Sequence, residues 1–164
     1  MTLPVKAIIS TEFIRLKPDE PSPGMIVIIF FTTVFSVSAQ QVNVNESEQT
    51  AVKLVIQNMF TAMKNSDTVL LKTCFSPTAV FQTIVSKDKV VVVKDETVQN
   101  FINSIGTQPA GSLDERIVFE TVKTNKDLAS VWTPYEFYYK DKYSHNGVNS
   151  FQLVKFKEGW KIQY

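Results

Sequence analysis

The sequence is poor in the residue types that most often carry chemistry. Its 164 residues include one cysteine, Cys74, and one histidine, His145. A single cysteine excludes an intramolecular disulfide, and one histidine and one cysteine far apart make no recognisable zinc site. Cys74 lies beside Leu71 and Phe75 without a nearby base. We therefore interpret it as a small buried apolar residue, not a reactive thiol.

Charge of one sign is also lacking, because 17 Lys and Arg nearly balance 16 Asp and Glu. A chain with so little net charge has no strong field to gather nucleic acid or anionic lipid. Its aromatic residues are not interleaved with a basic patch. Glycine-rich phosphate loops, nucleophile elbows and metalloprotease motifs are absent from the sequence. We therefore expect no nucleic-acid partner and no cofactor.

The longest apolar run covers residues 25–35. It is too short for a membrane-spanning helix, which needs about 20 apolar residues, but it has roughly the length of a signal-peptide core. Small or slim side chains follow at Val37 and Ala39, the positions that signal peptidase reads. The pattern predicts a signal peptide over 25–39 and a polar linker over 40–45. The alternative is a buried core strand.

The first 24 residues mix basic and acidic side chains with several prolines, which is unusual for the start of a signal peptide. We interpret them as an N-terminal extension; the alternative is that translation starts at Met25. The predicted product is exported, periplasmic or secreted, with no stable membrane span after cleavage. Export without a disulfide is more typical of a bacterium.

Three segments have the spacing of helices. Residues 46–64 carry apolar side chains at the i, i+3, i+4, i+7 spacing of one helix face. That stripe consists of Val52, Val55, Ile56, Met59, Phe60 and Met63. Residues 67–74 predict a short second helix, and residues 95–105 a third, with Asp95 as its cap and Gly106 at its end.

The remaining segments are rich in strand-forming residues. The expected strands cover residues 79–86, 90–94, 113–124, 128–139, 148–157 and 160–164. The order is therefore ααββαββββ. Helices followed by a long antiparallel meander predict an α+β fold in one domain over residues 46–164.

The aromatic run Val131–Tyr139 and the segment Tyr143–Phe156 predict a long hairpin that contains His145. With a two-residue turn, Glu136 and His145 share one face as diagonal neighbours. With an odd number of turn residues, His145 instead shares a face with Tyr135, Phe137 and Tyr139. Either register gives an aromatic surface with one titratable group, which is the composition of a small-molecule pocket.

Several segments resemble one known superfamily. They are Phe75–Phe81, Trp132–Phe137, Ser144–Gly147, Phe151–Val154 and Gly159–Ile162. With the order of elements, they resemble the nuclear transport factor 2-like, or SnoaL-like, superfamily, in the branch named for lumazine binding. The resemblance implies a cone-shaped α+β barrel, with a curved antiparallel sheet on three helices and a pocket at its open end. Exported bacterial proteins are common in that branch.

One position departs from the catalytic members of the superfamily, which often carry an acidic residue near the first strand. Thr78 stands there in this sequence. The departure lowers the expectation of proton abstraction by a carboxylate from that position.

We expect an exported small-molecule-binding protein. The predicted pocket residues are Phe81, Trp132, Tyr135, Phe137, His145 and Phe151. The apolar members of this set could instead fill the core, and His145 could lie exposed at a turn. One alternative function is a dehydratase or isomerase with His145 as acid/base, oriented by Glu136. Another is a non-catalytic interaction module that forms a homodimer.

Overall fold

The computed structural model describes residues 35–87 and 90–164. The predicted N-terminal extension and most of the predicted signal peptide lie outside the described residues. Within them the order of elements is the predicted one, except that the strand expected over 113–124 is divided into two. The α+β fold is confirmed: a curled antiparallel sheet packs on three helices within this part of the chain.

Helix α1 covers Phe35–Asn65 and is longer than predicted. Residues 40–45, expected to be a linker, continue the helix, and they contain no glycine or proline to end it. The predicted apolar stripe is confirmed over most of its length, because Val52, Ile56 and Met63 are buried. The stripe packs this helix on the sheet.

Helices α2 (Thr68–Cys74) and α3 (Val98–Gly106) each begin at a side-chain cap. At α2 the Asp67 carboxylate accepts from the amides of Val69 and Leu70, at 3.1 and 2.9 Å. At α3 the cap is Thr97, whose hydroxyl accepts from the Asn100 amide at 3.1 Å. Asp95, the predicted cap, instead lies in a strand that continues one residue past it.

Strands β1 (Phe81–Lys87) and β2 (Val90–Glu96) form a hairpin that is a sheet of its own. The hairpin joins the rest of the chain where the Val80 amide donates to the Gln163 carbonyl at 2.9 Å. Both faces of the hairpin expose apolar side chains. These include Ile84, Val91, Val92 and Val93.

The larger sheet contains β3 (Leu113–Ile117), β4 (Thr121–Asn125), β5 (Leu128–Tyr139), β6 (Lys142–Phe156) and β7 (Gly159–Ile162). Strands β3 and β4 pair in succession with the same edge of β5, and the strand order is β3-β5-β6-β7. Between them, the amides of Val118 and Glu120 still donate to β5 carbonyls, at 2.9 and 3.1 Å.

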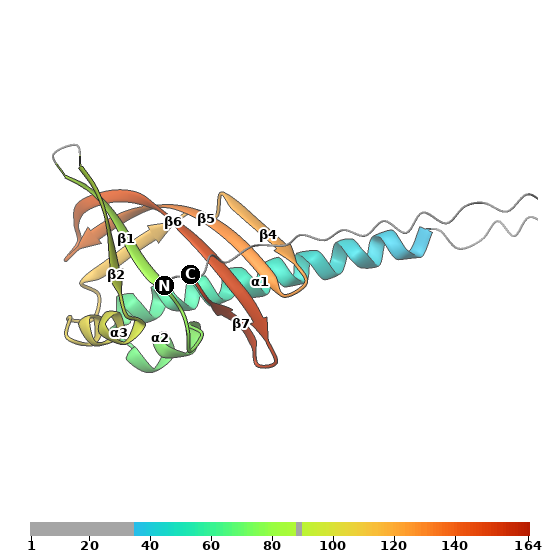
Figure 1. Ribbon diagram of the computed structural model, residues 1–164, viewed down its shortest axis with the longest axis horizontal. Coiled ribbons are helices and arrows are strands. Elements are labelled where there is room, and N and C mark those ends of the chain that lie inside the picture. The colour runs from blue at the N-terminus through green and yellow to red at the C-terminus, as the bar shows by residue number, and fades with distance from the viewer. Residues whose placement is uncertain (1–34, 88–89) are drawn as a thin grey trace, which may run out of the picture. The chain divides into compact units, whose positions relative to one another are not determined.

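The inner face of this sheet packs on α1, which runs across it in Figure 1. From β5 the buried side chains on this face are Ala129, Val131 and Thr133, and from β6 they are Phe151 and Leu153. The core therefore fills one half of the inner face. The other half, towards the β5–β6 turn, is left for the candidate site.

Candidate functional site

The register of the β5–β6 hairpin decides which side chains share the inner face. The turn has two residues, Lys140 and Asp141, both left-handed, with φ of 51° and 62°. A bulge just beyond the turn leaves Ser144 without a partner, so that His145 pairs with Phe137. The bulge has the same effect as the odd-numbered turn considered for the sequence. His145 therefore lies with the odd-numbered aromatic residues of β5.

Glu136 lies on the opposite face from His145. It pairs with Asn146, and successive strand residues point to opposite faces. Its carboxylate accepts a hydrogen bond from the Tyr138 hydroxyl at 2.9 Å. The predicted catalytic pair of Glu136 and His145 is therefore wrong, because the sheet separates the two side chains.

Three of the predicted pocket residues meet on the inner face. The His145 ring lies 5.1 Å from the Phe137 ring and 5.9 Å from the Tyr135 ring, measured between centroids. His145 is exposed, whereas the two β5 residues are half-buried. The Ser144 hydroxyl lies 3.0 Å from His145 Nδ1. These aromatic side chains form one wall at the open end of the sheet.

The other predicted pocket residues lie elsewhere. Trp132 is 45% exposed on the outer face, because its neighbours Val131 and Thr133 point inward. Phe151 is buried in the core, where its ring meets the Phe60 ring edge-on at 6.2 Å. Phe81 stacks on Phe101 of α3, with ring centroids 4.8 Å apart.

Three polar residues on the inner face, Glu115, Thr133 and Asn149, were not predicted as part of the site, and they lie with Tyr135, which was. Glu115 of β3 accepts a hydrogen bond from the Asn149 side chain of β6, at 2.8 Å from Nδ2 to Oε1. Asn149 pairs with Thr133, which is 0% exposed and whose hydroxyl has no partner among the described residues. We call Glu115, Thr133, Tyr135 and Asn149 the polar cluster.

The polar cluster has an unusual electrostatic environment. Burial raises the pKa of the Glu115 carboxyl, although the hydrogen bond from Asn149 acts in the opposite direction. Burial also raises the pKa of the Tyr135 hydroxyl, and the nearby charge of Glu115 adds to the increase. A carboxyl whose pKa is shifted by burial, next to a phenol, marks a candidate functional site.

Gly147 lets the Tyr135 side chain lie against β6. A Cβ atom at Gly147 would lie 2.6 Å from the Tyr135 hydroxyl oxygen and 2.7 Å from the ring carbon that carries it. These distances are shorter than any van der Waals contact, so the ring occupies the space that a side chain would need. Glycine at this position therefore permits the phenol to lie against β6 in the polar cluster.

A cavity of about 460 Å³ adjoins the polar cluster. Its wall is mostly apolar and comes from α1, β2, α3, the loop after α3, β3 and β5. The lining residues are Met63, Glu96, Phe101, Ser104, Ile105, Gln108, Leu113, Phe137 and Tyr139. No residue of the polar cluster lines the cavity, but Phe137 does and pairs with Glu115 in the sheet, so the cavity and the polar cluster are neighbours on the inner face. We call this cavity the α3 cavity.

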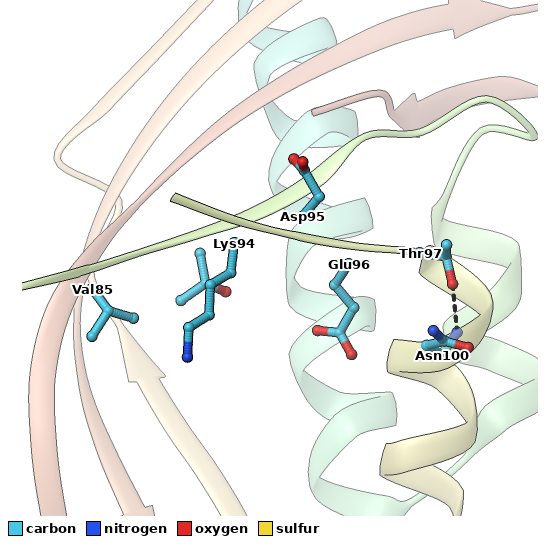
Figure 2. Close-up of a pocket in the computed structure, with 7 residues that line it drawn as sticks. Val85, Lys94, Asp95, Glu96, Thr97 and Asn100 are labelled. Carbon is cyan, nitrogen blue, oxygen red and sulfur yellow. Dashed lines mark hydrogen bonds between the residues drawn. The ribbon is translucent and has the colours of Figure 1, made fainter. Parts of the chain in front are cut away.

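Two other hollows are more polar. One of about 520 Å³ lies beside the β1–β2 hairpin, where Lys94 and Glu96 point to one side and Asp95 to the other (Figure 2). Another of about 1100 Å³ follows α1 beside the β4–β5 turn. Across residues 35–87 and 90–164, no group of three histidine, cysteine, aspartate or glutamate side chains could hold a metal ion. None of the described helices has the length and apolar character to cross a membrane.

One signal in the sequence could have identified Glu115. In the segment Leu113–Ile117 the two end residues are apolar and share a face with the middle one, which is Glu115. If the ends point inward, the carboxylate must point inward too. The neighbouring charges Asp114 and Arg116 hid this pattern, because together the three charges are typical of a solvated segment.

A curled antiparallel sheet wrapped on three helices, with its open end beside α3, defines the nuclear transport factor 2-like (NTF2-like) fold. Solved structures confirm the fold. An NTF2-like protein with a cystatin-like fold from Novosphingobium aromaticivorans aligns with a TM-score of 0.62 at 10% identity, over 80% of this chain and 88% of its own.

Two further structures agree. An NTF2-like protein of unknown function from Shewanella baltica aligns with a TM-score of 0.54 at 14% identity, over 80% of this chain and 93% of its own. A protein from Streptomyces avermitilis, provisionally named a dehydratase of the NTF2-like family, aligns with a TM-score of 0.55 at 14% identity, over 72% of this chain and 92% of its own. No family model matches the sequence, and no curated protein is significantly similar to it. At these identities the likeness shows the fold alone.

Proposed function

We propose that this protein binds a small, partly apolar organic molecule on the inner face of the sheet. The observation that carries the proposal is the α3 cavity beside a polar cluster that contains a buried hydroxyl without a partner. Ligand sites are typically cavities of about 300–1,000 Å³ with mostly apolar walls and a few placed polar groups. The predicted signal peptide supports the further proposal that the protein acts after export.

The two parts of the site have different roles. The ring or chain of the ligand packs between α3 and the sheet, where Phe101, Ile105 and Phe137 supply apolar surface. The polar end of the ligand reaches Glu115 and Tyr135 beyond Phe137. His145 stands at the exposed end of the same wall and supplies a further polar contact.

Filling the α3 cavity tests the proposal. Ser104 lines the cavity from α3, and Ser150 is exposed on the outer face, so Ser104→Phe fills the site and Ser150→Phe is the matched control. Bicyclic aromatic compounds such as 2-naphthamide should raise the melting temperature of the wild type and of Ser150→Phe, but not of Ser104→Phe. Equal shifts in all three proteins, or none in the wild type, would refute binding in this cavity.

A second candidate function is acid/base catalysis of the dehydratase or isomerase type, with Glu115 as the proton-transfer group. The raised pKa of Glu115 beside the Tyr135 hydroxyl favours it. This carboxyl comes from β3 and not from the position of Thr78. Exchange of the acidic C–H protons of 2-tetralone in D2O, followed by NMR, should be faster with wild type than with Glu115→Gln. Equal rates would exclude the role.

Homodimer formation through the outer sheet face remains a third proposal. Leu128, Trp132 and Val148 expose 53%, 45% and 47% of their surface on this face. Apolar side chains gathered on a surface often mark an interface. Sedimentation velocity at two concentrations tests it: the wild type should gain a dimer at the higher concentration, and Trp132→Ser should stay a monomer. A wild type that stays monomeric would rule this interface out.

A further inference from the structure

The Glu115 carboxylate lies over the middle of the inner face and not at its edge. Glu115 is on β3 and pairs with Phe137 of β5, yet it accepts a hydrogen bond from Asn149 of β6, on the far side of β5. The side chains of Glu115 and Asn149 therefore meet over β5. Because Asn149 pairs with Thr133, the charge lies near the buried hydroxyl of that residue.

The same carboxylate has no cationic partner among the described residues. The ion pairs there join Lys64 and Arg116 to Asp114, and Lys155 to Glu48. Asp114 and Arg116 alternate with Glu115 along β3 and so point to the other face. An anionic ligand at the polar cluster would meet an unpaired negative charge at close range, where the repulsion is strong.

The neighbouring groups offer hydrogen bonds that the protein itself leaves unused. The Thr133 hydroxyl is fully buried and has no partner in the described part of the chain. The Tyr135 hydroxyl is held against Gly147 and can donate to a ligand oxygen. A carboxylate that accepts and hydroxyls that donate are together complementary to a group that does both.

From this arrangement we infer that the site selects ligands by charge: it takes a neutral polar end that both donates and accepts hydrogen bonds, and it rejects carboxylates. Carboxamides, lactams and phenols have this chemistry. Glu115 is the residue that determines the selection, since it accepts from the ligand and repels anions. The inference rests on the proposed binding function and adds the ligand class.

Two probes that differ only at the polar end test the inference. 2-Naphthamide and 2-naphthoate share one ring system, and a slightly alkaline pH is chosen because burial raises the pKa of Glu115 and a higher pH favours its ionised form. Titrations followed by amide chemical shifts should give naphthamide at least about tenfold tighter binding than naphthoate, as expected for two like charges brought together in a partly buried site. The shifted signals should include residues of the polar cluster.

Variants assign the selectivity to its cause. Glu115→Gln removes the charge and keeps the shape, so it should bring the two affinities within about threefold, whereas Glu136→Gln on the outer face should leave the ratio unchanged. Thr133→Val should weaken the binding of naphthamide by about threefold to tenfold, since it removes one hydrogen bond. Equal affinities in the wild type, or an unchanged ratio in Glu115→Gln, would overturn the inference alone. Failure of both probes to bind would overturn the proposed function with it.

Discussion

The Tyr135 ring fills the space that a side chain at Gly147 would need, so we expect a side chain added at Gly147 to destabilise the site. We predict that Gly147→Ala destabilises the protein by about 1–3 kcal/mol, the usual cost of inserting a methyl group into an occupied space. The new Cβ would lie 2.6 Å from the Tyr135 hydroxyl oxygen, so the ring must move. Urea unfolding measures the loss.

A double-mutant cycle assigns that cost to Tyr135. In a Tyr135→Ala background the space is empty, and Gly147→Ala should then cost much less. Gly111 provides the comparison for space, because nothing lies within 4 Å of a Cβ built there, although its φ of 82° adds backbone strain of its own. An equal cost of Gly147→Ala in both backgrounds would show that the clash with the phenol is not the cause.

Glu115 should make stability fall as the pH rises. Burial raises its pKa in the folded state, so the unfolded chain loses its proton first. The stability present below the ordinary glutamate pKa is then lost as the pH rises through the higher folded value. Urea unfolding at several acidic to neutral pH values should show the wild type losing stability relative to Glu115→Gln over this window. A difference that does not change with pH would contradict the prediction.

Glu48 gives the control with the opposite sign. Hydrogen bonds from Lys155 and Trp160 hold its pKa below the ordinary value, so its contribution to stability is present at neutral pH and is lost on acidification. The wild type should therefore gain stability relative to Glu48→Gln as the pH rises. Opposite trends for the two variants would separate the effects of individual groups from the acid sensitivity of the whole fold.

At the scale of single elements, the hairpin β5–β6 shows how far the sequence leads. The aromatic run and the strand-forming residues after it predict both strands, and the structure confirms them. The face of His145 depends on one extra residue, Ser144, in a bulge beyond a two-residue turn. Neither Ser144 nor its neighbours Tyr143 and His145 is a glycine, and nothing else in the local sequence marks a bulge. Pairing with β5 therefore decides the register. The Glu136–His145 pair failed for this reason.

The hairpin of β1 and β2 should be the least stable strand pair of the fold. It pairs only with itself, and all seven residues of β2 are exposed, whereas β5 and β6 pair along most of their length and cover the core. Isolated two-stranded hairpins are marginal in water. Hydrogen exchange should therefore be faster at the amides of Ile84 and Val92 than at those of Val131 and Leu153. Equal protection of the two sets of amides against exchange would mean that contacts beyond its own pairing stabilise the β1–β2 hairpin.

For the whole molecule, the order of helices and strands could be predicted because apolar periodicity is local in the sequence. The site could be predicted only in part, because it depends on which face each strand turns inward. Trp132 was placed in the pocket and lies on the outer face, whereas Glu115 was missed and lies inside. A shift of one residue in register moves every side chain of a strand to the other face. Tertiary packing, and not local pattern, fixes that choice.

Glu48 also links the two layers of the molecule. From α1 its carboxylate accepts from Trp160 Nε1 of β7 at 2.8 Å and from Lys155 Nζ of β6 at 2.7 Å. We predict that Glu48→Gln lowers the free energy of unfolding by about 1 kcal/mol at neutral pH, a modest value because the ion pair is partly exposed. Urea unfolding at fixed pH measures this loss.

Because Glu48 ties α1 to both strands, helix and sheet should unfold together. Trp160 is 4% exposed, so its fluorescence in a Trp132→Phe background reports on the sheet, while far-ultraviolet circular dichroism at the helical minimum is dominated by the helices. The two signals should follow one urea transition with the same midpoint, as in a single cooperative unit. Separate midpoints would mean that α1 and the β6–β7 edge unfold independently. The Glu48 contacts would then be too weak to couple the unfolding of the helix to that of the sheet.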